Sequence, residues 1–173
     1  MSTTLIRRAT LNDAQALADF NQNMAWETES IRLIPSVILA GVTRMISDEN
    51  LGFYLVVENL EASEIVASLM ITTEWSDWRN GVFWWIQSVY VKPEWRRKGL
   101  YRALYQNAKS MAENEDSVCG FRLYVERENT VAQSVYASLG MQETHYQMYE
   151  ELKDNTIFCE PSSVEPGDEI TIS

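Results

Sequence analysis

The stretch Ile86–Leu104, IQSVYVKPEWRRKGLYRAL, decides how this chain is expected to fold. Its first part is rich in β-branched and aromatic residues, which indicates a long strand over Val82–Val91. After a short basic loop, apolar residues recur at helical spacing and predict a helix over Gly99–Ala112. A further strand, predicted at Gly120–Val125, completes a β-α-β unit with parallel strands and a right-handed crossover.

The same patterns, followed outward from this unit, predict one mixed α/β domain built around a single sheet. The other predicted strands are Thr4–Ala9, Phe53–Val57, Ile65–Trp75 and Met141–Glu150, and the other predicted helices run from Ala14 to about Trp26, from Pro35 to about Asp48 and over Ala132–Leu139. The short links before the β-α-β unit predict an antiparallel meander. The predicted element order is therefore β-α-α-β-β-β-α-β-α-β.

Composition places the chain among globular proteins. It has 173 residues, of which 46% are hydrophobic, and this is enough to bury one core without disulfides. Its net charge is -11, and Glu150–Ser173 holds seven acidic residues against Lys153. We therefore predict a domain over residues 1–150 and an acidic tail over residues 151–173. Within the tail, Thr156–Cys159 and Glu169–Ile172 can each add a short edge strand.

Several functional classes are excluded at this level. Two cysteines and one histidine are too few for a four-cysteine zinc site or a histidine-rich centre, so we expect no metal. No apolar run reaches the roughly 18 residues of a membrane helix, and the N-terminus lacks the pattern of a signal peptide. We expect a cytoplasmic protein. An acidic chain with one basic patch is not expected to bind nucleic acid.

The basic patch is a predicted anion site. Lys92–Arg102 holds five basic residues against Glu94, and it ends where the predicted helix begins at Gly99. The first amides of a helix have no intrahelical partners, and the helix dipole adds positive charge there. Such a loop can cradle a phosphate, which glycine allows to approach closely. A solvated helix start without function is the alternative, and physical reasoning alone favours neither.

Two motifs resemble those of the GCN5-related N-acetyltransferases (GNAT). RRKGLY at Arg96–Tyr101 is similar to that family's acetyl-CoA signature, Gln/Arg-x-x-Gly-x-Gly/Ala. NTVAQSVYASLGM at Asn129–Met141 is similar to its Asn-x-x-Ala-x-x-x-Tyr-x-x-Leu-Gly-Phe helix. The resemblance extends from Thr4 to about Tyr149. It implies an acyl-CoA N-acyltransferase fold, with a mostly antiparallel sheet and helices on both faces. It also implies direct acetyl transfer from acetyl-CoA to a primary amine, which we expect to belong to a small molecule.

The resemblance also implies roles for particular residues. Backbone amides of the basic loop would hold the coenzyme A pyrophosphate, and the backbone of Val89 and Val91 would bind the pantetheine arm. An amide near Val89 would stabilise the oxyanion. Tyr136 would protonate the departing thiolate as general acid, and Asn129 would bind the cofactor. The alternatives are an N-cap for Asn129 and a core position for Tyr136. The implied cofactor-binding residues are Val89, Tyr90, Val91, Arg96, Arg97, Lys98, Gly99, Leu100, Tyr101, Arg102, Asn129 and Tyr136.

The chain departs from the family pattern twice. Tyr101 stands where the signature has glycine or alanine, and its ring would cover the cofactor or point to solvent. Gln87 stands where some members carry a glutamate base, and an amide cannot accept a proton at neutral pH. Glu27 and Glu29, in a predicted loop after the first helix, are candidate bases or anchors for a cationic amine. Further candidates are Glu74 and Glu126, and solvent can also take the proton.

The sequence leaves two other functions open. Gln87 and Tyr101 favour a non-catalytic module that binds or senses coenzyme A, and an acetyltransferase acting on protein N-termini or lysines is the third hypothesis. Aromatic residues lie near the expected acceptor side, and we interpret them as core or dimer-interface residues of a homodimer. These residues are Trp26, Trp75, Trp78, Trp84 and Trp85. The alternative is a pocket with aromatic walls that suits an organic cation. Cys119 is expected to be a buried, inert thiol.

Overall fold

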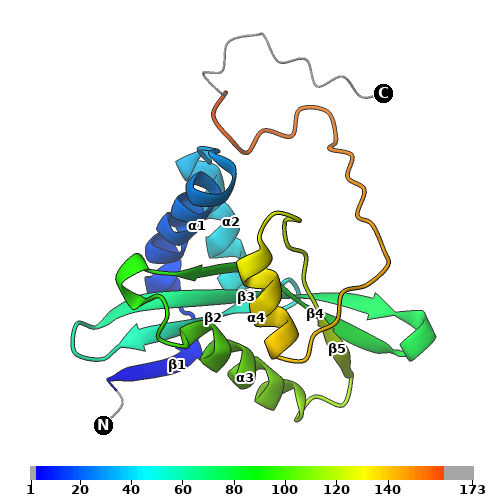
Figure 1. Cartoon of the computed structure of the whole chain (residues 1–173). Coiled ribbons are helices and arrows are strands. Elements are labelled where there is room, and N and C mark those ends of the chain that lie inside the picture. The colour runs from blue at the N-terminus through cyan, green and yellow to red at the C-terminus, as the bar shows by residue number, and fades with distance from the viewer. Residues whose placement is uncertain (1–2, 162–173) are drawn as a thin grey trace.

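A computed structural model describes residues 3–161, which form one five-stranded sheet in the order β1-β2-β3-β4-β5 (Figure 1). The strands are β1 Thr4–Arg8, β2 Gly52–Asn59, β3 Glu64–Ser76, β4 Gly81–Val91 and β5 Val118–Arg122. Neighbouring strands are antiparallel except β4 and β5, which are parallel. The prediction of a mixed, mostly antiparallel sheet with a β-α-β crossover is confirmed.

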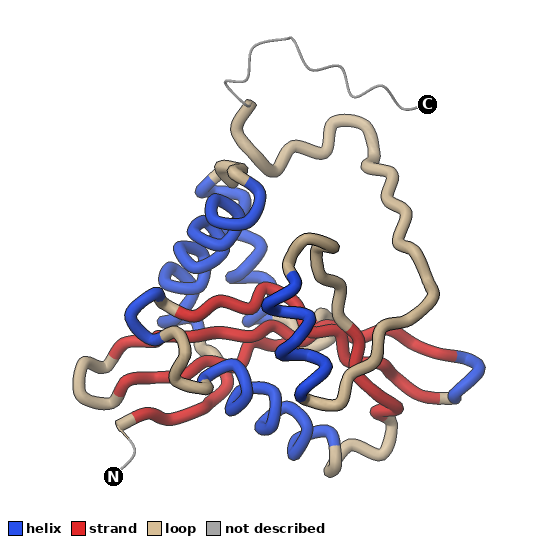
Figure 2. Tube along the Cα trace, viewed as in Figure 1, coloured by secondary structure: helices blue, strands red, loops and turns tan. Residues whose placement is uncertain are grey.

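Helices lie on both faces of this sheet, as the tube in Figure 2 also shows. They are α1 Ala14–Glu29, α2 Pro35–Ser47, α3 Leu100–Ala112 and α4 Thr130–Ser138. Successive residues of a strand point to opposite faces. On β2, Tyr54 therefore belongs to the core under α1 and α2, and Leu55 belongs to the core under α3. No helix among residues 3–161 is long and apolar enough to cross a membrane.

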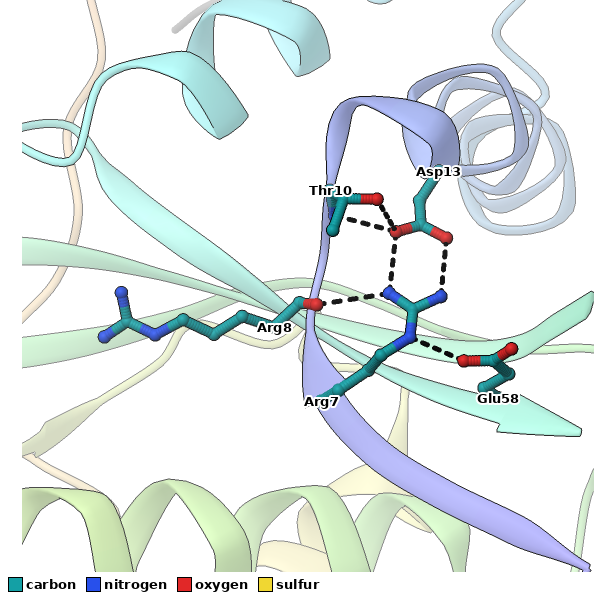
Figure 3. Close-up of polar contacts among 5 residues, drawn as sticks. All are labelled: Arg7, Arg8, Thr10, Asp13 and Glu58. Atoms are coloured by element: carbon teal, nitrogen blue, oxygen red, sulfur yellow. Dashed lines mark hydrogen bonds and ion pairs between the residues drawn. The ribbon is translucent and has the colours of Figure 1, made fainter. Parts of the chain in front are cut away.

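A buried carboxylate joins β1 to the start of α1 (Figure 3). The Arg7 guanidinium donates two hydrogen bonds to Asp13, at 2.8 and 3.0 Å, and a third to Glu58 at 2.6 Å. The Thr10 amide also donates to Asp13, at 2.7 Å. Burial acts to raise the pKa of Asp13, but the bonds from Arg7 and Thr10 outweigh it and hold that pKa below its ordinary value. The folded state therefore favours the ionised carboxylate.

Asp13→Asn is expected to lower the free energy of unfolding by about 2–3 kcal/mol at pH 7, because it removes one partner of a largely buried ion pair. A depressed folded pKa stabilises the protein above the ordinary value of 3.8, and this stabilisation is lost as pH falls through the folded pKa. The difference in free energy of unfolding between the wild type and Asp13→Asn should therefore be smaller at pH 3 than at pH 7. Urea unfolding at the two pH values measures it. Asp19→Asn, at an exposed position of α1, is the control. An equal loss of unfolding free energy in Asp13→Asn at both pH values would contradict the ion-pair explanation.

Helix α1 is longer than predicted. The loop expected to begin at Trp26 is wrong, because α1 continues to Glu29. The helix ends at Ser30, which adopts the left-handed conformation with φ of 56° and donates its N–H to the Trp26 carbonyl at 3.2 Å. No glycine or proline precedes this cap, so nothing in the local sequence stops the helix earlier. Glu27 and Glu29 are therefore helical residues.

The predicted strand Met141–Glu150 is also wrong, since these residues form no strand within the described part of the chain. Alternating apolar residues suit a strand, but a strand exists only when another strand pairs with it. Residues 141–161 leave α4 and return to the loop between the end of α1 and the start of α2, where the trace is orange in Figure 1. Of Thr156–Cys159, only Cys159 forms a bridge, with Leu33. Glu169–Ile172 lies outside the described residues.

Strand β5 differs from its prediction in position and in burial. It begins at Val118, two residues before the expected start, and it ends at Arg122. Cys119 is exposed, so the expectation of a buried thiol is wrong. The reason is that β5 is the last strand of the described sheet, with β4 as its one strand neighbour there.

Candidate active site

The sheet opens at the C-terminal half of β4. The pairing of β4 with β5 spans only Val82–Trp85 on β4, although β4 itself continues to Val91. Among the described residues, no strand therefore pairs with the β5 side of Ile86–Val91. Backbone N–H and C=O groups on such an edge need partners, and a ligand can supply them.

A β-bulge lies within the same half of β4. On β3, Ser68 pairs with Tyr90 and Met70 pairs with Gln87, so β4 contains one more residue than β3 between these two pairs. Ser88, inside this interval, has φ of 46°. A bulge redirects the adjoining backbone groups and often marks a site beside functional residues. Sequence reasoning missed Ser88, because no glycine or asparagine marked the positive φ.

The loop between β4 and α3 has the backbone of an anion site. Gly99, the N-cap of α3, has φ of 76°, and its carbonyl accepts the first helical bond from Ala103 at 3.0 Å. The amides of the residues between them therefore have no intrahelical partner. A Cβ on Gly99 would meet no atom within 4 Å. Glycine is thus required there by its left-handed conformation, and the space next to it is open to a ligand.

Arg96 joins this loop to α1 through Glu27. Its Nε donates to the Val91 carbonyl at 3.0 Å, and its Nη2 donates to Glu27 at 2.6 Å. The Tyr90 hydroxyl also donates to Glu27, at 3.3 Å. The structure therefore pairs a predicted phosphate ligand with a predicted base. Glu29, by contrast, is exposed and takes no part in this cluster.

Two tyrosines bring the two sequence motifs together. The Tyr101 ring lies 5.7 Å from Tyr136 on α4 and 6.3 Å from Tyr105, centroid to centroid. Arg102 adds a second link to α4, because its Nη2 donates to the Ser138 hydroxyl at 3.3 Å. The Tyr101 ring therefore packs against Tyr136 of α4 with its hydroxyl buried, so the expectation that it points to solvent is wrong. Burial raises the pKa of Tyr136, so its phenol keeps its proton at neutral pH.

Tyr101→Phe is expected to raise the free energy of unfolding by about 1 kcal/mol. The Tyr101 hydroxyl is buried, and it has no hydrogen-bond partner among the described residues. Burial also raises its pKa, as expected for a phenol without hydrogen-bond donors. Urea unfolding at pH 7 measures the change, with Tyr149→Phe at an exposed position as the control. A loss of stability in Tyr101→Phe would reveal a partner for this hydroxyl.

The remaining candidates are held by neighbours. Asn129 caps α4, because its Oδ1 accepts a hydrogen bond from the Ala132 amide at 3.1 Å. This bond confirms the N-cap interpretation. It leaves the side-chain nitrogen of Asn129, Nδ2, available to a ligand. Gln87 donates to Thr72 at 2.8 Å, so its Oε1 is available as an acceptor.

Two further acids were candidate bases. The Glu74 carboxylate accepts hydrogen bonds from the Trp85 indole and from Arg122, and these bonds lower its pKa. Glu74 is therefore a poor base at neutral pH. Glu126 precedes α4, and its backbone carbonyl accepts from Gln133 at 3.0 Å.

Two cavities lie beside α1. One of about 380 Å³ is open to the surface beside the returning tail, and it is lined by Gln22, Trp26, Ile31, Arg32, Leu33, Pro35 and Glu160. The other, of about 490 Å³, reaches the end of β4 at Tyr90 and Lys92. Neither cavity is lined by residues of β5, α3 or α4. The opening at β4 is therefore distinct from both.

Comparisons with known proteins agree with this geometry. The sequence profile of the acetyltransferase (GNAT) family matches residues 12–141. No curated protein matches the chain significantly. A solved structure of a possible acetyltransferase from Clostridium difficile 630 is 43% identical, with a TM-score of 0.81, and the match covers 88% of this chain and 99% of that one.

More distant structures share the fold. Glucosamine-6-phosphate N-acetyltransferase from Arabidopsis thaliana is 19% identical, with a TM-score of 0.67 over 88% of this chain and 100% of that one. Ribosomal-protein-alanine N-acetyltransferase from Brucella melitensis is 16% identical, with a TM-score of 0.68 over 87% and 99%. Together with the profile match and the 43% identical structure, the geometry of β4 and α3 establishes that this chain belongs to the GNAT acetyltransferase family.

Proposed function

We propose that this protein transfers an acetyl group from acetyl-CoA to a primary amine of a small molecule. The observation that carries the proposal is the bulged, unpaired edge of β4, which leads directly into the glycine-started helix α3. A strand edge suits the amide-rich pantetheine arm, and a helix start with free amides suits the pyrophosphate.

The residues present fit coenzyme A. Amides of Leu100, Tyr101 and Arg102 would hold the pyrophosphate, with charge from Arg97 and Lys98. The open space at Gly99 supports this fit. The Arg96 guanidinium donates hydrogen bonds to Glu27 and to the Val91 carbonyl, so it fixes the loop against α1.

The chemistry needs a polarised carbonyl and a proton donor. Acetyl-CoA supplies the acetyl group as a thioester. In our proposal the Val89 amide, beside the bulge, donates a hydrogen bond to the thioester oxygen. Tyr136 holds a proton at neutral pH and can give it to a departing thiolate.

We further propose that water takes the proton of the attacking amine. Glu27 is bonded to Arg96 and Glu74 to Arg122, and the bonds to Glu74 lower its pKa. Gln87 retains a free acceptor oxygen that can orient the amine or the water. Glu29 is exposed at the end of α1 and lies outside the cluster of Arg96, Tyr90 and Glu27, so no step is assigned to it.

In this proposal the acceptor is a small molecule, because the returning tail contacts the loop between α1 and α2 and leaves less room for a polypeptide at that end of α1. The Ile34 amide donates to the Phe158 carbonyl at 2.9 Å, and the Glu160 amide donates to Arg32 at 2.8 Å. The cavity of about 380 Å³ beside this contact has the size of a small-molecule site, but it is separate from the opening at β4 and does not locate the acceptor. The two distant relatives act on a sugar phosphate and on a protein, according to their names, so they favour neither class.

The first experiment is calorimetric titration of acetyl-CoA into the full chain, followed by thiol-release assays with a panel of amines and peptides. We expect micromolar binding and release of free thiol with small amines. Binding without transfer would favour the non-catalytic module, and transfer to peptides alone would favour a protein acetyltransferase. Absence of binding would overturn the proposal.

A further inference from the structure

Two polar side chains are buried between α1 and the sheet beside the bulged part of β4. Asn21 on α1 is 6% exposed, and Tyr54 on β2 is 4% exposed. A buried polar side chain destabilises the fold unless hydrogen bonds satisfy it, and asparagine is also unfavourable in the interior of a helix. The reaction proposed above assigns no step to either residue.

The register of the sheet places Tyr54 next to the bulge. Tyr54 pairs with Met70 on β3, and Met70 pairs with Gln87 on β4, so these three residues form one row across the sheet. Residues directly opposite in paired strands share a face, and the core under α1 contains both Tyr54 and Met70. Ser88, the residue with φ of 46°, directly follows the end of this row.

Hydrogen bonds join Tyr54 both to α1 and to the bulge. Burial raises the pKa of the Tyr54 hydroxyl, and hydrogen bonds with the side chains of Asn21 and Ser88 oppose this rise. The Asn21 side chain also donates through Nδ2 to the Leu17 carbonyl at 2.8 Å, which fixes the amide against its own helix. A continuous set of hydrogen bonds, the Asn21–Tyr54–Ser88 network, therefore runs from α1 to the bulge.

We propose that Asn21 and Tyr54 are positioning residues, which hold Ser88 in its left-handed conformation and thereby direct the Val89 amide into the opening at β4. A residue with a Cβ is strained in this conformation, so it needs support from its neighbours. Because the peptide bond is planar, the backbone angles of Ser88 set the direction of the Val89 N–H. The inference rests on the proposed function, in which this N–H donates to the thioester oxygen.

A neighbouring hydroxyl lies outside this network and provides the matched control. Ser68 on β3 pairs with Tyr90, just beyond the bulge, and is 1% exposed. Its hydroxyl has no hydrogen-bond partner among the described residues. Ser68→Ala therefore removes a buried hydroxyl from the same region without breaking a bond to Ser88.

Tyr54→Phe tests the hydroxyl, because it keeps the buried ring. One oxyanion donor typically contributes a factor of about 10² to 10³ in kcat, and a misdirected donor retains part of it, so we expect kcat to fall about tenfold in thiol-release assays. Affinity for acetyl-CoA in calorimetric titration should change less than about threefold, because the lost interaction forms mainly in the transition state. Ser68→Ala should change neither quantity.

Substitutions of Ser88 distinguish positioning from general packing. Ser88→Ala keeps the strain and removes the hydroxyl, so it should reproduce the loss of Tyr54→Phe, and the two losses should not add. Glycine adopts a positive φ without strain, so Ser88→Gly should keep kcat within about threefold of the wild type. Adding Tyr54→Phe to Ser88→Gly should then lower kcat less than about twofold, because no strained residue remains to be held.

Nuclear magnetic resonance of the free protein tests the geometry without turnover. The Val89 amide resonance should shift in Tyr54→Phe and in Ser88→Ala, and it should stay in place in Ser68→Ala. Circular dichroism checks that each variant is folded. A shift of Val89 in a protein that does not bind acetyl-CoA would mean that the network orients this amide but that the proposed function is wrong.

Three results would overturn the inference. The first is a Val89 resonance that does not move in Tyr54→Phe. The second is a wild-type kcat in Tyr54→Phe. The third is a loss of kcat on Tyr54→Phe that is equally large with and without Ser88→Gly, which would assign Tyr54 to packing under α1.

Discussion

Gly99→Glu is expected to weaken acetyl-CoA binding on the order of a hundredfold. Two physical effects add at this position. Any side chain is strained there, because φ is 76°, and this costs roughly 1–2 kcal/mol for a residue in the left-handed region. A carboxylate at the start of α3 would also repel the pyrophosphate that the free amides are proposed to hold. Calorimetric titration with acetyl-CoA measures the combined loss.

Gly99→Ala separates these two effects. A Cβ at this position meets no atom within 4 Å, so alanine introduces strain without a clash or a charge. We expect the loop of the free variant to relax away from this conformation. Restoring it on binding would cost about 1.4 kcal/mol, which corresponds to a tenfold loss of affinity. Gly41→Glu is the matched control, because Gly41 is exposed on α2 and also has open space around it. Equal binding by the wild type and Gly99→Glu would mean that the anion site lies elsewhere.

Tyr136→Phe is expected to lower kcat at least a hundredfold while acetyl-CoA affinity stays the same. General acid catalysis typically contributes factors of about 10² to 10⁴, and phenylalanine keeps the ring contact with Tyr101 while removing the proton. Steady-state kinetics measures kcat, and calorimetry measures affinity. Tyr105→Phe is the control, because it removes a hydroxyl from another ring that contacts Tyr101.

The pH profile gives a second measure of this role. A general acid must be protonated, so the wild-type rate should fall at high pH as Tyr136 loses its proton. Burial raises the pKa of Tyr136 above 10.0, so this fall should begin later than for an exposed phenol. Tyr136→Phe should lack this alkaline decline. Full activity in Tyr136→Phe would instead assign the residue to the packing between α3 and α4.

Local patterns in the sequence were sufficient for the framework of the fold and for much of the candidate site. The β-α-β unit, the helix start at Gly99 and the cap at Asn129 depend on residues close in the chain, so composition and spacing predict them. The two motifs also indicate the family, because each consists of a few side chains at fixed spacing within one short segment. The motifs lie on two different helices, α3 and α4, and the fold brings these helices into contact through Tyr101 and Tyr136.

Tertiary structure decided what depends on partners distant in sequence. Arg96 and Glu27 are 69 residues apart, and only the packing of α1 against the end of β4 brings them together. The bulge at Ser88 depends on the pairing of β4 with β3. Between the pairs Ser68–Tyr90 and Met70–Gln87, β4 contains one more residue than β3. The inward position of Tyr101 depends on α4, and the unpaired state of Met141–Glu150 depends on which strand edges are within reach. Backbone preferences are local, whereas pairing and burial are set by neighbours that the sequence alone does not specify.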